Sequence, residues 1–163
     1  MSFQPKSRHQ YLDSQQLREY MKQCQETLDS VDPETEEPYE WKVWGVLTFQ
    51  GFITFSRARQ LFSRWLGGIR KEVQPHFVNW FSVVAHDRWN KDTRIHFLLG
   101  GRRVAYQARW SVRWKGLSRG DAAISEYRTD SPDAFVRHVL QNAHAGYYFE
   151  IAMDFCGYGP FEV

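Results

Sequence analysis

The alternation of hydrophobic and polar residues along the chain predicts a mixture of helices and strands. Residues 14–28 place apolar side chains at the three- and four-residue spacing of an amphipathic helix, and Asp13 or Ser14 can cap its first turn. Residues 57–71 repeat this spacing directly after Ser56, which predicts a second helix of the same kind. Two further helices are predicted over 103–114 and 132–143.

Apolar runs bounded by turn residues predict the strands. WFSVVAH and RIHFLLG are joined by DRWNKDT, a spacing typical of a hairpin with a long loop. Five strands are predicted in all, over 42–49, 80–86, 94–100, 121–128 and 147–154. The expected fold class is therefore α+β, with a central antiparallel sheet of about five strands flanked by helices and an extra N-terminal helix.

The chain divides into two regions by composition. Residues 1–12 are polar and predict a loose start, and residues 29–40 form an acidic stretch with two prolines that is typical of a linker. We therefore expect residues 1–40 to be an N-terminal helix with its acidic linker, and residues 41–163 to be the main domain.

Charge follows the same division. The formal net charge is +2, but residues 1–40 carry four basic and nine acidic residues, whereas residues 41–163 carry seventeen and ten. Most of the seventeen are arginine, whose planar guanidinium suits phosphate contacts. A basic body with an acidic arm favours contact with nucleic acid, although a solvated linker beside an ordinary basic surface gives the same count.

Aromatic residues make up 17% of the chain and include seven tryptophans. They have two interpretations: a bulky core, or exposed rings that stack on bases beside arginines. The two cysteines, Cys24 and Cys156, form no CxxC pair and indicate neither a disulfide framework nor a zinc site. The sequence has no apolar run of membrane-spanning length and no apolar leader, so we expect a cytoplasmic protein without membrane contact.

Three segments, taken in order, resemble a known family. The family's opening strand is similar to GVLTFQ at 45–50. Its next strand, loop and following strand are similar to WFSVVAHDRWNKDTRIHFLLGG at 80–101. Its tyrosine-bearing helix is similar to DAFVRHVLQN at 133–142. Together they resemble the replication initiator (Rep) proteins of rolling-circle plasmids and phages, in the HUH endonuclease superfamily. The resemblance covers about residues 42–153 and implies the HUH, ferredoxin-like Rep fold.

The resemblance also implies a particular chemistry. In that family two histidines and an acidic residue hold a divalent metal that polarises a phosphate of single-stranded DNA, and a tyrosine attacks the phosphorus. Aligning LLGG at 98–101 with the family motif places His96 at the second histidine, Arg94 at the first, and Ala85 at the glutamate. Phe135 takes the tyrosine position, and Arg137 or His138 takes that of the following lysine.

One ligand of three and no nucleophile remain at these positions, so we expect no metal, no cofactor and no cleavage. Arg94 can neutralise a phosphate where the family has its metal, or it is an ordinary strand residue beside an abandoned pocket. The expected function is the binding of single-stranded or hairpin DNA without cutting it. The residues expected to contact nucleic acid are Arg57, Arg64, Arg88, Trp89, Arg94, His96, Arg102, Arg103, Arg137 and His138.

Two alternatives stay open. A catalytically dead domain from a mobile element can be reused as a protein-binding inhibitor or regulator, for example in counter-defence, with residues 14–40 as the contact surface. An active nicking enzyme would need substitute residues. His86 is one candidate ligand, although neighbouring strand residues face opposite sides, and the candidate nucleophiles are Tyr106, Tyr127, Tyr147 and Tyr148.

Overall fold

The computed structural model describes residues 6–11, 14–31, 36–76, 78–87, 92–128, 131, 133–142 and 149–156. The strands are β1 (Lys6–Tyr11), β2 (Trp41–Thr48), β3 (Asn79–Asp87), β4 (Asp92–Gly100), β5 (Ala122–Glu126) and β6 (Phe149–Cys156). The helices are α1 (Ser14–Leu28), α2 (Phe55–Val73), α3 (Arg109–Ser118) and α4 (Ala134–Asn142). The order of elements along the chain is thus an α+β pattern, as the sequence predicts.

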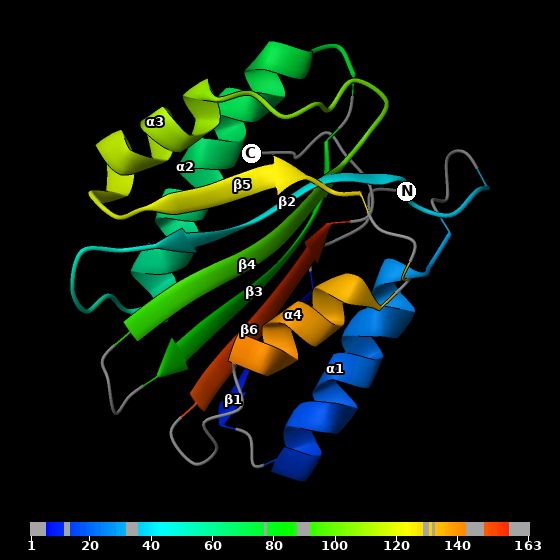
Figure 1. Cartoon of the computed structure of the whole chain (residues 1–163), viewed down its shortest axis with the longest axis vertical. Coiled ribbons are helices and arrows are strands. Elements are labelled where there is room, and N and C mark those ends of the chain that lie inside the picture. The colour runs from blue at the N-terminus through cyan, green and yellow to red at the C-terminus, as the bar shows by residue number, and fades with distance from the viewer. Residues whose placement is uncertain are drawn as a thin grey trace.

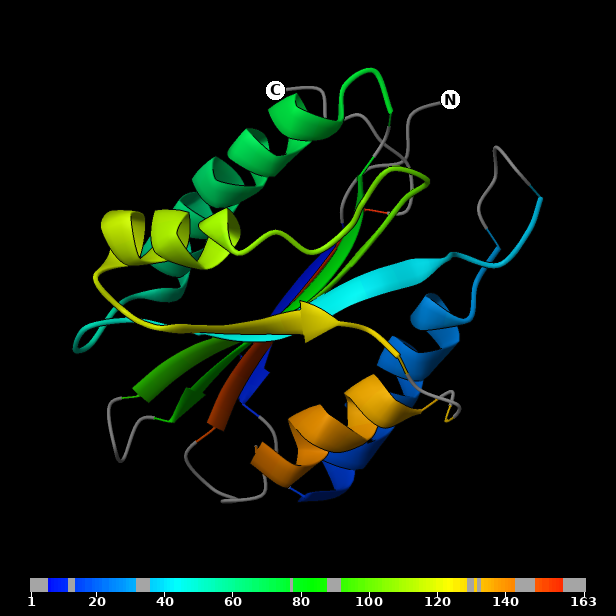
Figure 2. The same cartoon turned by 45° about the horizontal axis from the view of Figure 1, so that its top comes forward.

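All six strands join one sheet in the order β1-β6-β3-β4-β2-β5, and every neighbouring pair is antiparallel. Helices α2 and α3 cover one face of this sheet, while α1 and α4 cover the other (Figure 1). The view in Figure 2 separates the two helical layers, with the sheet between them. The first and last strands of the chain, β1 and β6, lie side by side at one end of the sheet.

Helix α2 forms where the sequence supplies both an amphipathic pattern and capping groups. The Thr54 side chain accepts a hydrogen bond from the backbone N–H of Arg57 at 3.2 Å, which satisfies a donor of the first turn. Arg70 and Lys71 lie in the last turn, where positive charge complements the helix dipole. The apolar side of the helix is buried against the sheet at seven positions: Ala58, Leu61, Phe62, Trp65, Leu66, Ile69 and Val73.

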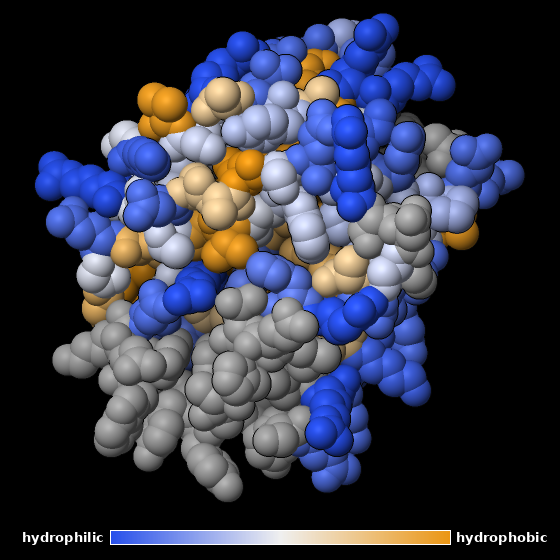
Figure 3. Space-filling model, in the orientation of Figure 1, coloured by the Kyte–Doolittle hydropathy of each residue, from blue (hydrophilic) through white to orange (hydrophobic). Residues whose placement is uncertain are grey.

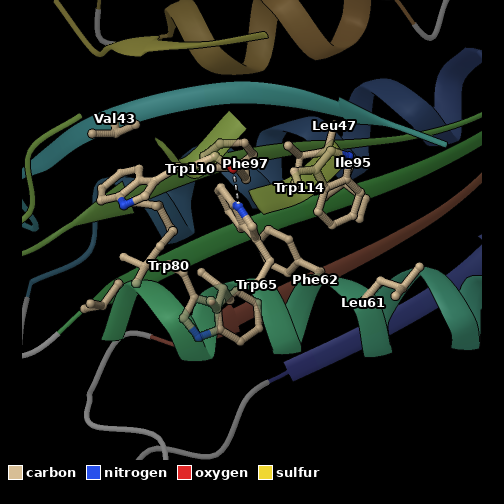
Figure 4. Packing of buried hydrophobic residues seen from close by; sticks show 14 of the residues in the cluster. Val43, Leu47, Leu61, Phe62, Trp65, Trp80, Ile95, Phe97, Trp110 and Trp114 are labelled. Carbon is tan, nitrogen blue, oxygen red and sulfur yellow. Dashed lines mark hydrogen bonds between the residues drawn. The ribbon is translucent and has the colours of Figure 1, made fainter. Parts of the chain in front are cut away.

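The core between the sheet and the α2 and α3 layer contains most of the described tryptophans. Trp65, Trp110 and Trp114 are at most 1% exposed, and their rings meet edge to face (Figure 4). The indole N–H of Trp65 donates to the carbonyl of Trp110 at 2.9 Å, and that of Trp114 donates to the carbonyl of Thr48 at 2.9 Å. These rings are core residues, so they offer no stacking surface to a base.

A second, smaller core lies on the opposite face of the sheet. Met21, Cys24 and Leu28 of α1 are buried there, in one cluster with Phe81 of β3 and Phe135 of α4. Burial raises the pKa of the Cys24 thiol above its usual range. The apolar side of α1 is therefore occupied within the molecule, and its polar side remains for any outside partner.

Two expectations about the elements are wrong. Among the described residues the sheet has six strands rather than about five, because residues 6–11, expected to be a loose start, pair along β6. Their polar sequence gives no hydrophobic pattern, since strand pairing there is made by backbone groups. The third helix covers Arg109–Ser118 rather than 103–114, because a turn first forms after β4, in which the N–H of Val104 bonds to the carbonyl of Gly101.

Candidate nucleic-acid interface

The register of the central hairpin brings three of the aligned positions together. Ala85 of β3 pairs with Arg94 of β4, and Val83 pairs with His96, without a register shift between the two strands. Side chains alternate along a strand, and the next residues on β4 after each of these, Ile95 and Phe97, pack in the α2 core. Arg94 and His96 therefore belong to the face that α1 and α4 cover.

His96 is buried at the centre of that face. Its side chain is 1% exposed, and its ring centroid lies 5.4 Å from that of His138 on α4. Burial, together with the nearby positive charges of His138 and Arg94, lowers the pKa of His96 to about 3. The imidazole is thus neutral near pH 7, and its Nδ1 has no hydrogen-bond partner among the described residues.

A neutral imidazole is able to ligate a metal, but it needs further ligands beside it. Within the part of the chain that the structure describes, no three His, Cys, Asp or Glu side chains come together in a way that could hold a metal ion. His86, the substitute ligand considered above, lies on the other face. Its Nδ1 is 2.7 Å from the hydroxyl oxygen of Thr93, and its ring contacts Phe55 of α2 edge to face at 5.9 Å.

Arg94 has a carboxylate beside it. Its Nε donates to Oδ2 of Asp92 at 2.8 Å, and both side chains are a little under half exposed. Asp92 stands two residues earlier on the same strand, so it shares the face of Arg94. A phosphate at Arg94 would therefore compete with Asp92 for the guanidinium.

Phe135 lies inside the second core. It is 1% exposed, and its ring meets that of Phe81 edge to face, with centroids 5.8 Å apart. The position aligned with the Rep tyrosine thus holds a buried ring without a hydroxyl. Tyr127 lies nearby and is half-buried: burial raises the pKa of its hydroxyl, despite a hydrogen bond with the backbone of Phe135 that acts the other way. Tyr106 packs against the α2 core, and Tyr147 and Tyr148 fall outside the described residues.

A shallow groove of about 310 Å³ runs beside α4 over strands β2 and β5. Its lining residues are Trp44, Gly45, Val46, Ala123, Ile124, Ser125 and His138. Trp44 is half-buried there; its indole N–H donates to the Ser125 hydroxyl at 3.0 Å, and its ring lies 5.6 Å from that of His138. Figure 3 shows hydrophobic surface near the middle of this view, over β2 and β5, with hydrophilic residues around it.

The residues expected to contact nucleic acid do not form one surface. Arg94, His96, Arg137 and His138 belong to the face of the sheet that α4 covers, and Arg137 forms an ion pair with Asp133 at 2.6 Å. Arg57 and Arg64 are exposed on α2, on the other side of the sheet, and Arg102 and Arg103 are exposed in the turn after β4. Arg88 and Trp89 fall outside the described residues.

Trp44 lines this groove but is not among the residues that the sequence predicts to contact nucleic acid. A signal for it was present, because Val43 and Leu47 alternate with Trp44 and Val46 along β2. Val43 and Leu47 are buried in the α2 core, so the alternation directs Trp44 to the opposite face. The strand pattern alone does not predict the groove, because α4 supplies its other wall.

Comparisons with protein-family models, with curated proteins and with solved structures find no significant match to this chain. Among the described residues, no helix is both long enough and apolar enough to cross a membrane.

Proposed function

We propose that this chain is a Rep-like, HUH-related domain that binds single-stranded or hairpin DNA and does not cleave it. The observation that carries the proposal is the placement of the aligned positions. Ala85 and Arg94 pair across two strands, and Phe135 and His138 come from the helix that covers the same face. Segments far apart in the sequence thus meet at one place, as the resemblance requires.

The groups found at that place support binding without cleavage. Cleavage by this chemistry needs a metal held by several ligands and a hydroxyl that attacks phosphorus. Ala85 has no carboxylate, Phe135 has no hydroxyl, and His96 is a single buried imidazole. Tyr127 is a poor substitute nucleophile, because burial raises the pKa of its hydroxyl and so makes the attacking phenolate harder to form.

The groove beside α4 supplies the binding surface in this proposal. Its wall of Trp44, Val46 and Ala123 suits the flat apolar face of a base. Arg94 and Arg137 supply phosphate contacts when their carboxylate partners, Asp92 and Asp133, give way. Exposed ion pairs of this kind contribute little to stability, so a phosphate can replace either carboxylate at small cost.

Binding and cleavage are tested together with single-stranded and hairpin DNA oligonucleotides, with and without manganese or magnesium. A mobility shift that needs no metal, without a covalent adduct on a denaturing gel, is the expected result. An adduct would mean that the protein has a working nucleophile and metal site, and it would contradict the proposal that the protein does not cleave DNA. Absence of both shift and adduct would reject the proposal in favour of a protein partner.

Matched variants locate the site. Arg137→Ala removes a cation of α4 that neighbours His138, a lining residue of the groove, whereas Arg128→Ala removes an exposed cation that pairs with Glu126. Both changes lower the net charge equally. We expect the first to weaken binding of single-stranded DNA severalfold and the second to leave it within twofold; equal losses would place the binding site elsewhere.

A further inference from the structure

The helical layer on the other side of the sheet holds most of the positive charge of the molecule. We define the α2–α3 layer as residues 55–76 and 101–120. Of the chain's 21 basic and 19 acidic residues, eleven basic and one acidic residue fall in this layer, which leaves ten basic and eighteen acidic residues elsewhere. Because α2 and α3 lie side by side (Figure 2), this charge is concentrated on one side of the molecule.

The one acidic residue of the layer, Glu72, faces its neighbours within the layer. Its carboxylate accepts hydrogen bonds from Nε of Arg109 at 2.9 Å, from the indole N–H of Trp110 at 2.8 Å, and from Nη2 of Arg113. The guanidinium of Arg113 also lies against Gly68, where any Cβ would fall 2.4 Å from its Nη1. Glu72 thus joins α3 to α2, and it neutralises little of the positive charge that the layer turns to solvent.

Three of the cations form a line along α2. Arg57, Arg64 and Lys71 follow one another at intervals of seven residues, which places them on the same side of the helix, and all three are exposed. Among the described residues no acidic side chain pairs with them. At 1.5 Å per residue the line spans about 21 Å, over which duplex DNA carries about twelve phosphate charges.

Residues with polar side chains line a slightly concave surface beside this line. Between Arg57 and Arg64 it has a volume of about 510 Å³ and is lined by Ser56, Arg57, Arg59, Gln60, Ser63 and Arg64. Hydroxyl, amide and guanidinium groups of this kind are those that contact phosphate and sugar oxygens. The line of cations therefore lies among groups that match a nucleic-acid backbone.

We infer that the α2–α3 layer binds the sugar-phosphate backbone of a nucleic-acid duplex. A duplex is favoured over a single strand because Trp65, Trp110 and Trp114 are buried. Phe55 and Tyr106 of the layer are partly buried against the core, so bases find little to stack on. A membrane surface is disfavoured, since Val112 is the one large apolar side chain exposed by the layer's described residues, and interfacial helices expose an apolar face. This inference does not depend on the groove beside α4.

The test compares two triple variants of the full chain that lose equal charge. Arg57→Ala with Arg64→Ala and Lys71→Ala removes the line on α2, while Arg18→Ala with Lys22→Ala and Arg128→Ala removes exposed cations elsewhere. Fluorescence anisotropy measures the affinity for a 20-base-pair duplex of mixed sequence between 50 and 200 mM salt. We expect the first variant to bind about tenfold more weakly or worse, with the salt slope lowered by about one per contact removed.

Each other outcome has a defined meaning. If the wild type does not bind the duplex, if the control variant loses as much affinity as the α2 variant, or if anionic vesicles bind the layer more tightly than DNA does, the inference is overturned. The affinity for single-stranded DNA tests the groove beside α4 separately. Binding of single strands without duplex binding would overturn this inference alone. Duplex binding without single-strand binding would overturn the groove beside α4 as a binding surface and leave this inference standing. Thermal unfolding of each variant checks that it is folded.

Discussion

The ring of His96 lies under that of His138, with centroids 5.4 Å apart and ring planes at 72° to each other. One ring comes from the central strand β4 and the other from α4, so this contact joins the sheet to the helix above it. Burial lowers the pKa of both imidazoles. Protonation of either ring at low pH therefore destabilises this contact.

The first prediction concerns pH. Because the folded pKa of His96, about 3, lies below its ordinary value of 6.5, the unfolded chain binds the proton more readily. The stability due to the neutral ring is fully present above pH 6.5 and is lost as the pH falls toward 3. His96→Leu should lower the slope of unfolding free energy against pH in this window, by at most about 1.4 kcal/mol per pH unit. Titration of the His96 ring near pH 6.5 by NMR would contradict this.

The second prediction tests the alignment of β3 with β4. Ala85→Glu with Arg94→His places a carboxylate and a second imidazole near His96, because all three positions share the face covered by α4. We expect manganese to raise the melting temperature of this variant, by an amount equivalent to about 2.7 kcal/mol at one hundred times the Kd. Wild type and the single variant Ala85→Glu are the controls. No metal-dependent shift in a folded double variant would show that the three positions do not converge.

The third prediction concerns Phe135→Tyr. The added hydroxyl would enter the second core beside Phe81, among mostly apolar side chains, so we expect a loss of about 1–3 kcal/mol in unfolding free energy. Denaturant unfolding measures it, and the same variant should form no covalent adduct with DNA. A stable variant that does form an adduct would mean that the ring faces an open site.

The fourth prediction concerns Glu72. Burial alone would raise its pKa, but the hydrogen bonds from Arg109, Trp110 and Arg113 outweigh this and lower it to about 2. The stability that this carboxylate contributes is present above its ordinary pKa of 4.5 and is lost as the pH falls from there toward 2. Glu72→Gln should cost about 1–3 kcal/mol at pH 7, because an amide replaces a charged acceptor. An unchanged melting temperature at pH 7 would disprove the joining role of Glu72.

The fifth prediction uses two glycines as a matched pair. A Cβ on Gly45 would lie 2.5 Å from the carbonyl oxygen of Ala123 and 2.9 Å from the Phe97 ring, so Gly45→Ala should separate β2 from β5 and cost about 1–3 kcal/mol. Gly116 on α3 has open space around it, and Gly116→Ala should stabilise by about 0.5–1 kcal/mol. Chemical denaturation of both variants decides the matter, and a tolerated Gly45→Ala would refute this close approach.

The sequence predicts the elements wherever an apolar pattern reports burial. The helix over 14–28 is confirmed at both ends, and the hairpin of β3 and β4 is confirmed with ends one or two residues further out. Strand β1 escapes prediction because backbone pairing leaves no trace in a polar sequence. The sequence also misplaces the start of α3, for another reason. The pattern of residues 103–114 suits a helix throughout, but Gly101 and Val104 form a turn before the helix begins.

The site is predicted less completely, because it depends on which faces meet. The sequence predicts both His96 and His138 as site residues, but their contact depends on how α4 lies across the sheet. The pairing of Arg94 with Asp92 was within reach, as residues two apart on a strand share a face. The sequence does not predict that the sheet separates Arg57 from Arg137, because the order of residues does not show which face of the sheet each helix covers.

The pairing of β1 with β6 also affects how the chain reaches its fold. Lys6 of β1 lies opposite Phe155 of β6, and β6 also pairs with β3 on its other side. Neither β1 nor this edge of β3 can complete its hydrogen bonds until β6 is in place. On the ribosome the sheet must remain incomplete, with β3 exposed along one side, until residues 149–156 emerge. Contacts between such distant segments slow folding and lengthen the time in which an unpaired strand edge is open to other chains. The edge of β3 should therefore stay open to other chains for longer when residues 149–156 are synthesised or paired more slowly.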